Sequence, residues 1–166
     1  LTRPTEPSRA VQARMAAETA ARAGVVGPAA ALAESDGAPP RLRAALARSL
    51  AGLAPRIVAL SRDIHAHPEV GYHEHRAAAA VAGLLRECGI EPEVGVYGMD
   101  TALRAEIGPA GAPAIAVLAE FDALPGIGHG CGHNVMCANS VGAFLALAAL
   151  ARTRPGALPG RVVLQT

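Results

Sequence analysis

Two stretches of the chain carry apolar residues at helical spacing. The first begins near Arg41 and forms one stripe: Leu42, Leu46, Leu50, Leu53, Ile57, Leu60 and Ile64. We expect Pro55 to start or kink a second helix within this stretch and Pro68 to end it, because proline lacks the backbone donor that a helix uses. Residues 74–88 predict a further helix, which Gly89 is placed to cap.

The pattern changes to a period of two after Gly89. Residues 91–97 and 101–107 are strand candidates, and a turn rich in glycine and proline follows at 108–113. Residues 114–121 form a nearly unbroken apolar run, which is typical of a central strand covered on both faces.

The end of the chain completes a strand–loop–helix–strand unit. A glycine-rich loop covers 122–134, small residues predict a helix over 138–152, and 161–165 reads as a strand. This order predicts an α/β fold with a largely parallel central sheet flanked by helices.

Residues 1–40 differ from the rest of the chain. They are rich in Ala, Pro and Arg, and proline and glycine interrupt them repeatedly. Residues 11–23 could form a short Ala-rich helix with few large apolar side chains. We expect residues 1–40 to be a flexible leader and 41–166 to be the folded domain. A transit peptide is the alternative, which the acidic residues of this segment disfavour.

Composition excludes several classes of protein. A content of 51% hydrophobic and 17% charged residues is that of a folded chain. A net charge of +1 and only 2% aromatic residues argue against nucleic-acid binding. No long apolar run is free of charge or of Gly and Pro, so we expect no transmembrane helix. Three cysteines without a CxxC pair favour a reducing compartment, and we expect a cytoplasmic protein.

The candidate chemistry lies directly after the expected central strand, at the edge where α/β sheets bind ligands. Cys131 and His133 are two positions apart in a glycine-rich loop. If the loop is extended, this spacing brings thiolate and imidazole to one side, a pair that suits a divalent ion such as zinc. Asp122 is placed to accept the outer N–H of a ligating histidine. The alternative is an ordinary buried cysteine and a satisfied histidine.

Nucleotide binding is a competing interpretation of the same loop. Gly126, Gly128 and Gly130 follow a strand, as in a dinucleotide fingerprint. However, the third glycine of that fingerprint would fall at Cys131 or His133, and the chain has no lysine for a phosphate loop. We therefore do not expect a nucleotide site.

A second cluster of polar residues covers 63–72. His65 and His67 could bind a metal together in an extended segment, whereas on a helix they diverge, and Pro68 disfavours helix at His67. Taken alone, the cluster reads as a helix end with polar caps. Four other candidate side chains are expected to be structural or solvated: Cys88, Cys137, His73 and His75.

Together the two clusters resemble a known family. His-Ala-His-Pro-Glu-Val-Gly-Tyr at 65–72, with Glu-Phe-Asp-Ala-Leu-Pro-Gly-Ile-Gly-His-Gly-Cys-Gly-His-Asn at 120–134, resembles the aminoacylase/carboxypeptidase-type dinuclear metallopeptidases. The similarity is to the branch of hippurate hydrolases, auxin-conjugate amidohydrolases and p-aminobenzoyl-glutamate hydrolase subunits. It covers residues 50–166, in the order of the family.

The resemblance implies a zinc-peptidase-like α/β catalytic domain with a lid domain further along the chain. It also implies two divalent ions per complete site, zinc or manganese, with Cys131 and His133 as ligands and Asp122 as the acid that supports the metal centre. The implied reaction is hydrolysis of an amide bond in an N-acyl amino acid or a small peptide. The complete protein could form a homo-oligomer.

Departures from the family pattern affect the expected role of three positions. Glu120 stands where many relatives carry Asp, and we assign it no role; Gly130 replaces a usual Ala, and Asn134 stands where Asp is common. Family members continue into a Glu-Glu pair, further His ligands and the lid. We therefore expect a truncated catalytic domain, inactive alone. The alternative is a non-catalytic binding or structural domain with a vestigial metal site.

Overall fold

The computed structural model describes residues 9–23 and 37–166. The chain divides into two units, Leu1–Pro39 and Pro40–Thr166. The first unit contains helix α1 (Ala10–Ala23), in which Arg14 and Glu18 form an ion pair one turn apart at 2.9 Å. Residues 1–8 and 24–36 of the expected leader lie outside the described residues, so its flexibility stays a prediction.

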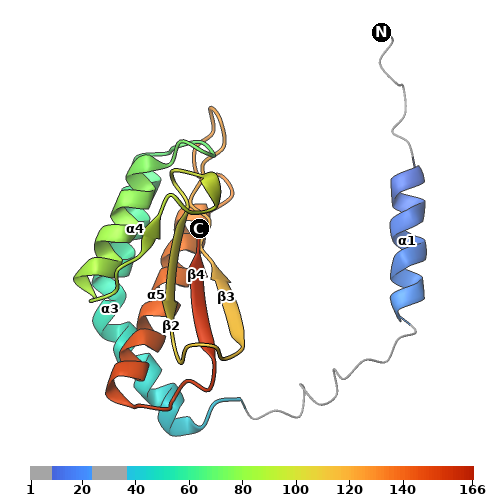
Figure 1. Ribbon diagram of the computed structural model, residues 1–166. Helices are drawn as coiled ribbons and strands as arrows, with labels where there is room; N and C mark the ends of the chain where they lie inside the picture. The colour runs from blue at the N-terminus through green and yellow to red at the C-terminus, as the bar shows by residue number, and fades with distance from the viewer. Residues whose placement is uncertain (1–8, 24–36) are drawn as a thin grey trace. The chain divides into compact units, whose positions relative to one another are not determined.

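The second unit places three helices on one face of a four-stranded sheet (Figure 1). The helices are α3 (Pro40–Ala66), α4 (His75–Glu87) and α5 (His133–Thr153). The strands are β1 (Glu93–Val94), β2 (Leu103–Ile107), β3 (Ala114–Leu118) and β4 (Arg161–Gln165), and a short 3₁₀ turn covers Val96–Gly98.

Helix α3 runs continuously through Pro55, so the expectation that a second helix starts at this residue is wrong, whereas the expected kink stays a prediction. Proline at position 55 deprives the carbonyl of Ala51 of its usual helical partner. Because both residues are exposed, water can take the place of that donor. Only Leu60 and Ile64 of this helix are fully buried, which places its packing face in the C-terminal part.

Helix α4 ends as its sequence predicts. The amide of Gly89 donates to the carbonyl of Arg86 at 2.8 Å, and that of Ile90 donates to Leu85 at 3.0 Å. These two bonds are the Schellman pattern, which needs a left-handed residue after the helix. Gly89 adopts φ = 77° there.

The strand order is β1-β2-β4-β3. Strands β3 and β4 pair in parallel, as the strand–helix–strand unit predicts, whereas β2 pairs antiparallel with both β4 and β1. The sheet is therefore more mixed than we expected from the sequence. The reason is that β4 inserts between β2 and β3, which are consecutive in the chain.

Two glycines make this insertion possible. A Cβ at Gly160, which precedes β4, would lie 2.7 Å from the carbonyl oxygen of Pro113. A Cβ at Gly108 would lie 2.4 Å from the carbonyl oxygen of Gly160, and Gly108 also adopts φ = 106°. The backbones at the start of β4 are too close for any side chain.

The buried strand is β4, not β3. Val162, Val163 and Leu164 of β4 are buried, whereas Ile115 and Leu118 of β3 are 64% and 63% exposed. The apolar run at 114–121 predicted a central strand, but β3 is the edge of the described sheet. Apolar composition identifies a strand without identifying its neighbours, which is why the prediction of its position was wrong.

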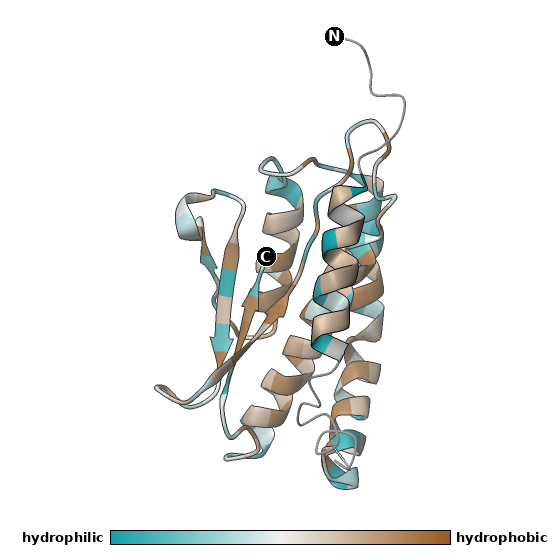
Figure 2. Ribbon diagram, turned by 90° about the vertical axis from the view of Figure 1, so that its right-hand side faces the viewer, coloured by the Kyte–Doolittle hydropathy of each residue, from teal (hydrophilic) through white to brown (hydrophobic). Residues whose placement is uncertain are grey.

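Helix α5 packs between α3 and the sheet and forms the centre of the core. Its fully buried side chains include Phe144, Leu145 and Val141. Figure 2 shows apolar residues concentrated in the strands and in the helix packed on them. By length and composition, α3 and α5 would each be able to cross a membrane. The core position of α5 accounts for its apolar character, and the expectation of no transmembrane helix stays a prediction.

Candidate metal centre

The two motifs meet at the end of the sheet where the parallel strands β3 and β4 terminate (Figure 1). The amide of Ala123 donates to the carbonyl of Glu69 at 2.7 Å, and Val70 and Ala123 form a parallel β-bridge. The ring of Pro68 lies beside Gly128, within 4 Å of where a Cβ would stand. The loop at 122–134 is thus supported by the segment that connects α3 to α4.

Glu69 also organises the start of α4. Its carboxylate accepts bonds from the amides of Arg76 at 3.0 Å and Ala77 at 2.9 Å. These amides belong to the first turn of α4, where backbone donors have no partner within the helix. One residue therefore fixes both the helix start and the position of Ala123.

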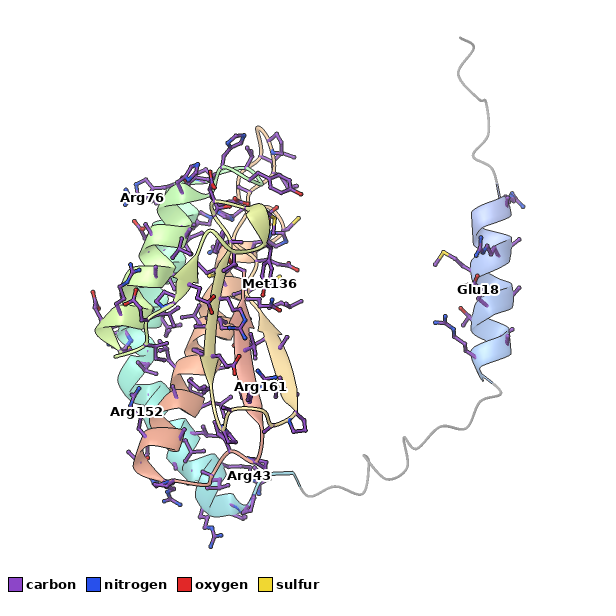
Figure 3. All side chains as sticks on the ribbon, viewed as in Figure 1. Glu18, Arg43, Arg76, Met136, Arg152 and Arg161 are labelled. Carbon is purple, nitrogen blue, oxygen red and sulfur yellow. The ribbon has the colours of Figure 1, made fainter. Side chains whose placement is uncertain are left out.

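Helix α5 begins at His133, five residues before the start that the sequence predicted at 138. Gly132 precedes it in the left-handed region, with φ = 77°. The small residues after 138 carried the sequence signal, whereas the true first turn contains polar and β-branched residues. Figure 3 shows Met136, in this first turn, toward the carboxyl ends of β3 and β4, with Arg152 at the far end of the helix.

His133 is oriented by Asp122. Its Nδ1 lies 2.7 Å from the Oδ1 of Asp122 and 3.1 Å from the carbonyl oxygen of the same residue. Both partners are acceptors, so Nδ1 carries the proton and donates. In the neutral imidazole, Nε2 then keeps its lone pair, which is the arrangement of a metal-ligating histidine.

A second carboxylate faces the other ring nitrogen. The Oε2 of Glu120 lies 3.4 Å from the Nε2 of His133. The side chain of Glu120 is 50% exposed, whereas that of His133 is 20% exposed. The sequence analysis assigned Glu120 no role, because only the fold shows that it and Asp122 lie on opposite sides of one imidazole.

Cys131 lies in a turn and is exposed. The turn is closed by the amide of Gly132, which donates to the carbonyl of His129 at 3.0 Å. The extended loop that we assumed for Cys131 and His133 is therefore wrong. Across residues 9–23 and 37–166, no three His, Cys, Asp or Glu side chains converge as a metal-binding group.

His129 is a further donor that the sequence analysis did not assign. Its Nε2 donates to the carbonyl of Ile64 at 3.0 Å, and its ring stacks on His65 with centroids 6.1 Å apart. Its Nδ1 is buried and has no hydrogen-bond partner in the described part of the chain. Burial lowers the pKa of His129, which favours the neutral ring and a free lone pair on Nδ1.

Asn134 ties the first turn of α5 to α3. It is 6% exposed, and its side-chain amide donates to the hydroxyl of Ser61 at 2.9 Å and to the Ser61 carbonyl at 3.3 Å. An aspartate could donate neither bond in its ionised form. Asn at this position, where the family commonly has Asp, therefore supplies the N–H donors that bind Ser61.

His65 and His67 do not form a chelating pair. His65 lies in the last turn of α3 and stacks on His129, whereas the Nδ1 of His67 contacts the carbonyl of Asp63 at 2.9 Å. Arg76 pairs with Asp63 at 2.7 Å and lowers the pKa of that carboxyl. The interpretation as a helix end with polar contacts accounts for this cluster.

The remaining candidates lie away from the loop chemistry. Cys137 is fully buried in the core, and Cys88 is partly buried, with Arg56 donating to its sulfur at 3.3 Å. His73 and His75 are exposed.

These donors define a class of site. The His133 imidazole lies between the carboxylates of Asp122 and Glu120, and the exposed thiol of Cys131 belongs to the same loop as His133, at the carboxyl ends of the parallel strands. Imidazole, thiolate and carboxylate are the ligands that zinc and similar divalent ions take in proteins. The residue types are those of a metal-dependent hydrolase, and the described residues bring together two donors of such a centre, His133 and Glu120.

Comparison with known proteins identifies relatives of this class. No family model matches the chain. The Xaa-Arg dipeptidase of Mus musculus is 36% identical over 124 residues, covering 67% of this chain and 28% of that protein. The N-acetyl-L-cysteine deacetylase of Bacillus subtilis is 30% identical over 131 residues, covering 70% of this chain and 30% of that protein.

Solved structures show the same fold. A dinuclear metal binding peptidase of the M20 family from Bacillus subtilis matches with a TM-score of 0.58 and 29% identity, over 69% of this chain and 34% of that one. An aminobenzoyl-glutamate utilization protein from Klebsiella pneumoniae matches in fold alone, with a TM-score of 0.52 and 21% identity, over 72% of this chain and 37% of that one.

These matches confirm the resemblance: the chain is related to the M20 amidohydrolases and peptidases. The expected zinc-peptidase-like α/β fold is confirmed as well. The chain spans about a third of the length of the relatives it matches.

Proposed function

We propose that this chain supplies part of the metal centre of a metal-dependent amidohydrolase that cleaves the amide bond of an N-acyl amino acid or a dipeptide. The observation that carries the proposal is the Asp122–His133 hydrogen bond of 2.7 Å, which leaves the Nε2 of His133 free at the ligand-binding edge of the sheet. Relatives whose names describe a dipeptidase and a deacetylase support the substrate class.

Each residue has one task in this proposal. His133 and Cys131 hold the ion, and Asp122 fixes the tautomer and the direction of His133. A divalent ion bound there, zinc or manganese, supplies Lewis-acid activation of the scissile carbonyl and of water. Gly132 and the first turn of α5 hold His133 at the point where the loop ends and the helix begins.

The first test measures the heat of zinc binding to the 166-residue chain and its variants. We expect His133→Ala and Cys131→Ser to weaken binding strongly. Asp122→Asn should weaken it about 10–100-fold, because a partner that orients a metal-bound histidine contributes that much. His73→Ala, which removes an exposed histidine outside the loop, is the matched control and should change nothing. Equal zinc binding by wild type and His133→Ala would contradict the proposal.

The second test separates catalysis from binding alone. The product of the whole gene and the 166-residue chain are assayed separately on a panel of N-acyl amino acids and dipeptides with zinc or manganese. We expect turnover by a protein that supplies the remaining ligands and a general base, and none by the 166 residues alone. Zinc binding without hydrolysis by the product of the whole gene would favour the alternative of a non-catalytic domain with a vestigial site.

A further inference from the structure

We propose that Glu120 is a ligand of the same metal ion as His133. The inference rests on the proposed function and adds a residue to which the sequence pattern assigned no role. It is carried by the geometry of three consecutive residues, Glu120, Phe121 and Asp122, around one imidazole ring.

The two carboxylates differ in their distance from the ring. Asp122 lies 2.7 Å from Nδ1, which is an ordinary hydrogen bond. Glu120 lies 3.4 Å from Nε2, which is longer than a usual N–H···O bond of about 2.7–3.2 Å. In a tetrahedral zinc site with bonds of about 2.0–2.2 Å, neighbouring ligand atoms stand about 3.4 Å apart. Asp122 is thus placed as a hydrogen-bond partner and Glu120 as a co-ligand.

The alternation of the backbone explains how two nearby acids reach opposite ring nitrogens. Phe121 is 5% exposed and packs into the core, so its neighbours on either side point away from the core. Ala119 anchors this segment beside β4, because its amide donates to the carbonyl of Gln165 at 2.8 Å. A buried residue between two acids therefore holds both carboxylates against His133.

The half-exposed carboxylate suits an ion that enters from solvent. The Glu120 side chain is 50% exposed and accepts no hydrogen bond from the described residues. The carboxylate can therefore bind a metal ion without breaking a hydrogen bond. Together with the Nε2 of His133 it would give two neighbouring donors, a carboxylate and an imidazole, both of which zinc accepts.

The test compares zinc binding by the 166-residue chain with that of Glu120→Gln, which keeps the shape and removes the charge. We expect the dissociation constant to rise about tenfold or more, the loss seen even for groups one step removed from a metal. Glu91→Gln is the control, because Glu91 is a surface carboxylate paired with Arg86 at 2.8 Å. Glu120→Asp keeps the charge but shortens the side chain by one methylene, so it should also weaken binding if the carboxylate must reach the ion.

The outcomes separate this inference from the proposed function. If His133→Ala weakens binding and Glu120→Gln does not, Glu120 is not a ligand and the proposed function stands. If Glu120→Gln weakens binding and Glu120→Asp does not, Glu120 acts only through its charge and the inference is overturned. If His133→Ala changes nothing, both are overturned.

Discussion

At the scale of single residues, the three cysteines differ sharply in environment. Cys131 is exposed in a turn, Cys88 is partly buried, and Cys137 is fully buried. Burial raises the pKa of the Cys137 thiol to about 12, so this thiol stays protonated at any pH the protein meets. Since the thiolate is the reactive form, exposure and pKa together predict an order of reactivity.

Alkylation with iodoacetamide at pH 8 should therefore modify Cys131 first and leave Cys137 unmodified until the protein is denatured. Mass spectrometry of timed samples measures the order, and the Cys131→Ser variant identifies the fast site. Added zinc should slow the modification of Cys131 if this thiol binds the ion. Rapid labelling of Cys137 in the folded protein would contradict the core position of that residue.

At the scale of the elements, an ion pair joins the neighbouring antiparallel strands β2 and β4. Glu106 of β2 pairs with Arg161 of β4 at 2.9 Å and also contacts Arg104. Arg161, and then Arg104, lower the pKa of Glu106 below its usual value of 4.5. The folded state therefore binds a proton at this carboxyl less readily than the unfolded chain does.

The sign of the pH effect follows from that lowered pKa. The stability that Glu106 contributes is present above pH 4.5 and is lost as the pH falls through the lowered folded pKa. We expect Glu106→Gln to destabilise the protein at pH 7 and to have a smaller effect at pH 3. Urea unfolding at both pH values measures the difference, and an equal effect at the two would contradict the assignment.

The insertion of β4 between β2 and β3 makes a second prediction at this scale. Gly160→Ala places a Cβ 2.7 Å from a backbone oxygen that cannot move without displacing the turn at 108–113. We expect a loss of about 1–3 kcal/mol in the free energy of unfolding, as for other overpacked sites. Gly52→Ala, an exposed helical position with open space around it, should instead gain about 0.5–1 kcal/mol. Thermal unfolding of both variants checks the contrast.

At the scale of the whole molecule, β3 presents an apolar edge. Ile115 and Leu118 are exposed on the outermost strand of the described sheet, and unpaired strand edges recruit other strands. We expect Ile115→Lys to reduce aggregation on warming, measured by light scattering, without changing zinc binding. Val58→Lys removes an exposed apolar residue from α3 and is the control. Equal protection by both variants would show that an added charge anywhere on the surface, and not the change at the strand edge, reduces aggregation.

Sequence patterns located most elements of this molecule because each has a local cause. The stripe of α3, the Schellman end of α4 at Gly89 and the strand at 161–165 all depend on residues close in the chain. The position of β3 in the sheet and the role of Glu120 depend on neighbours that the fold brings from far along the chain. Such contacts leave no periodic signal in the sequence. The apolar composition of β3 therefore predicted a central position that is wrong, and no pattern indicated a role for Glu120.

The candidate site shows the same division. The motifs identified Asp122, Cys131 and His133, and the structure joins two of them by a hydrogen bond. The expected geometry of Cys131 was wrong because the glycines around it form a turn rather than an extended segment. The catalytic and metal-binding roles of all three stay predictions until the binding experiments are made.

The hydrogen bond from the Ala123 amide to the Glu69 carbonyl holds the 122–134 loop against the α3–α4 connection, so exchange of this amide proton reports on that contact. That amide belongs to the residue after Asp122, and its acceptor is the carbonyl of Glu69, whose carboxylate binds the first turn of α4. It can exchange with deuterium only when the loop and the α3–α4 connection separate. The hydrogen-exchange rate of the Ala123 amide in heavy water therefore measures how often the 122–134 loop separates from the α3–α4 connection. The measurement needs neither metal nor substrate.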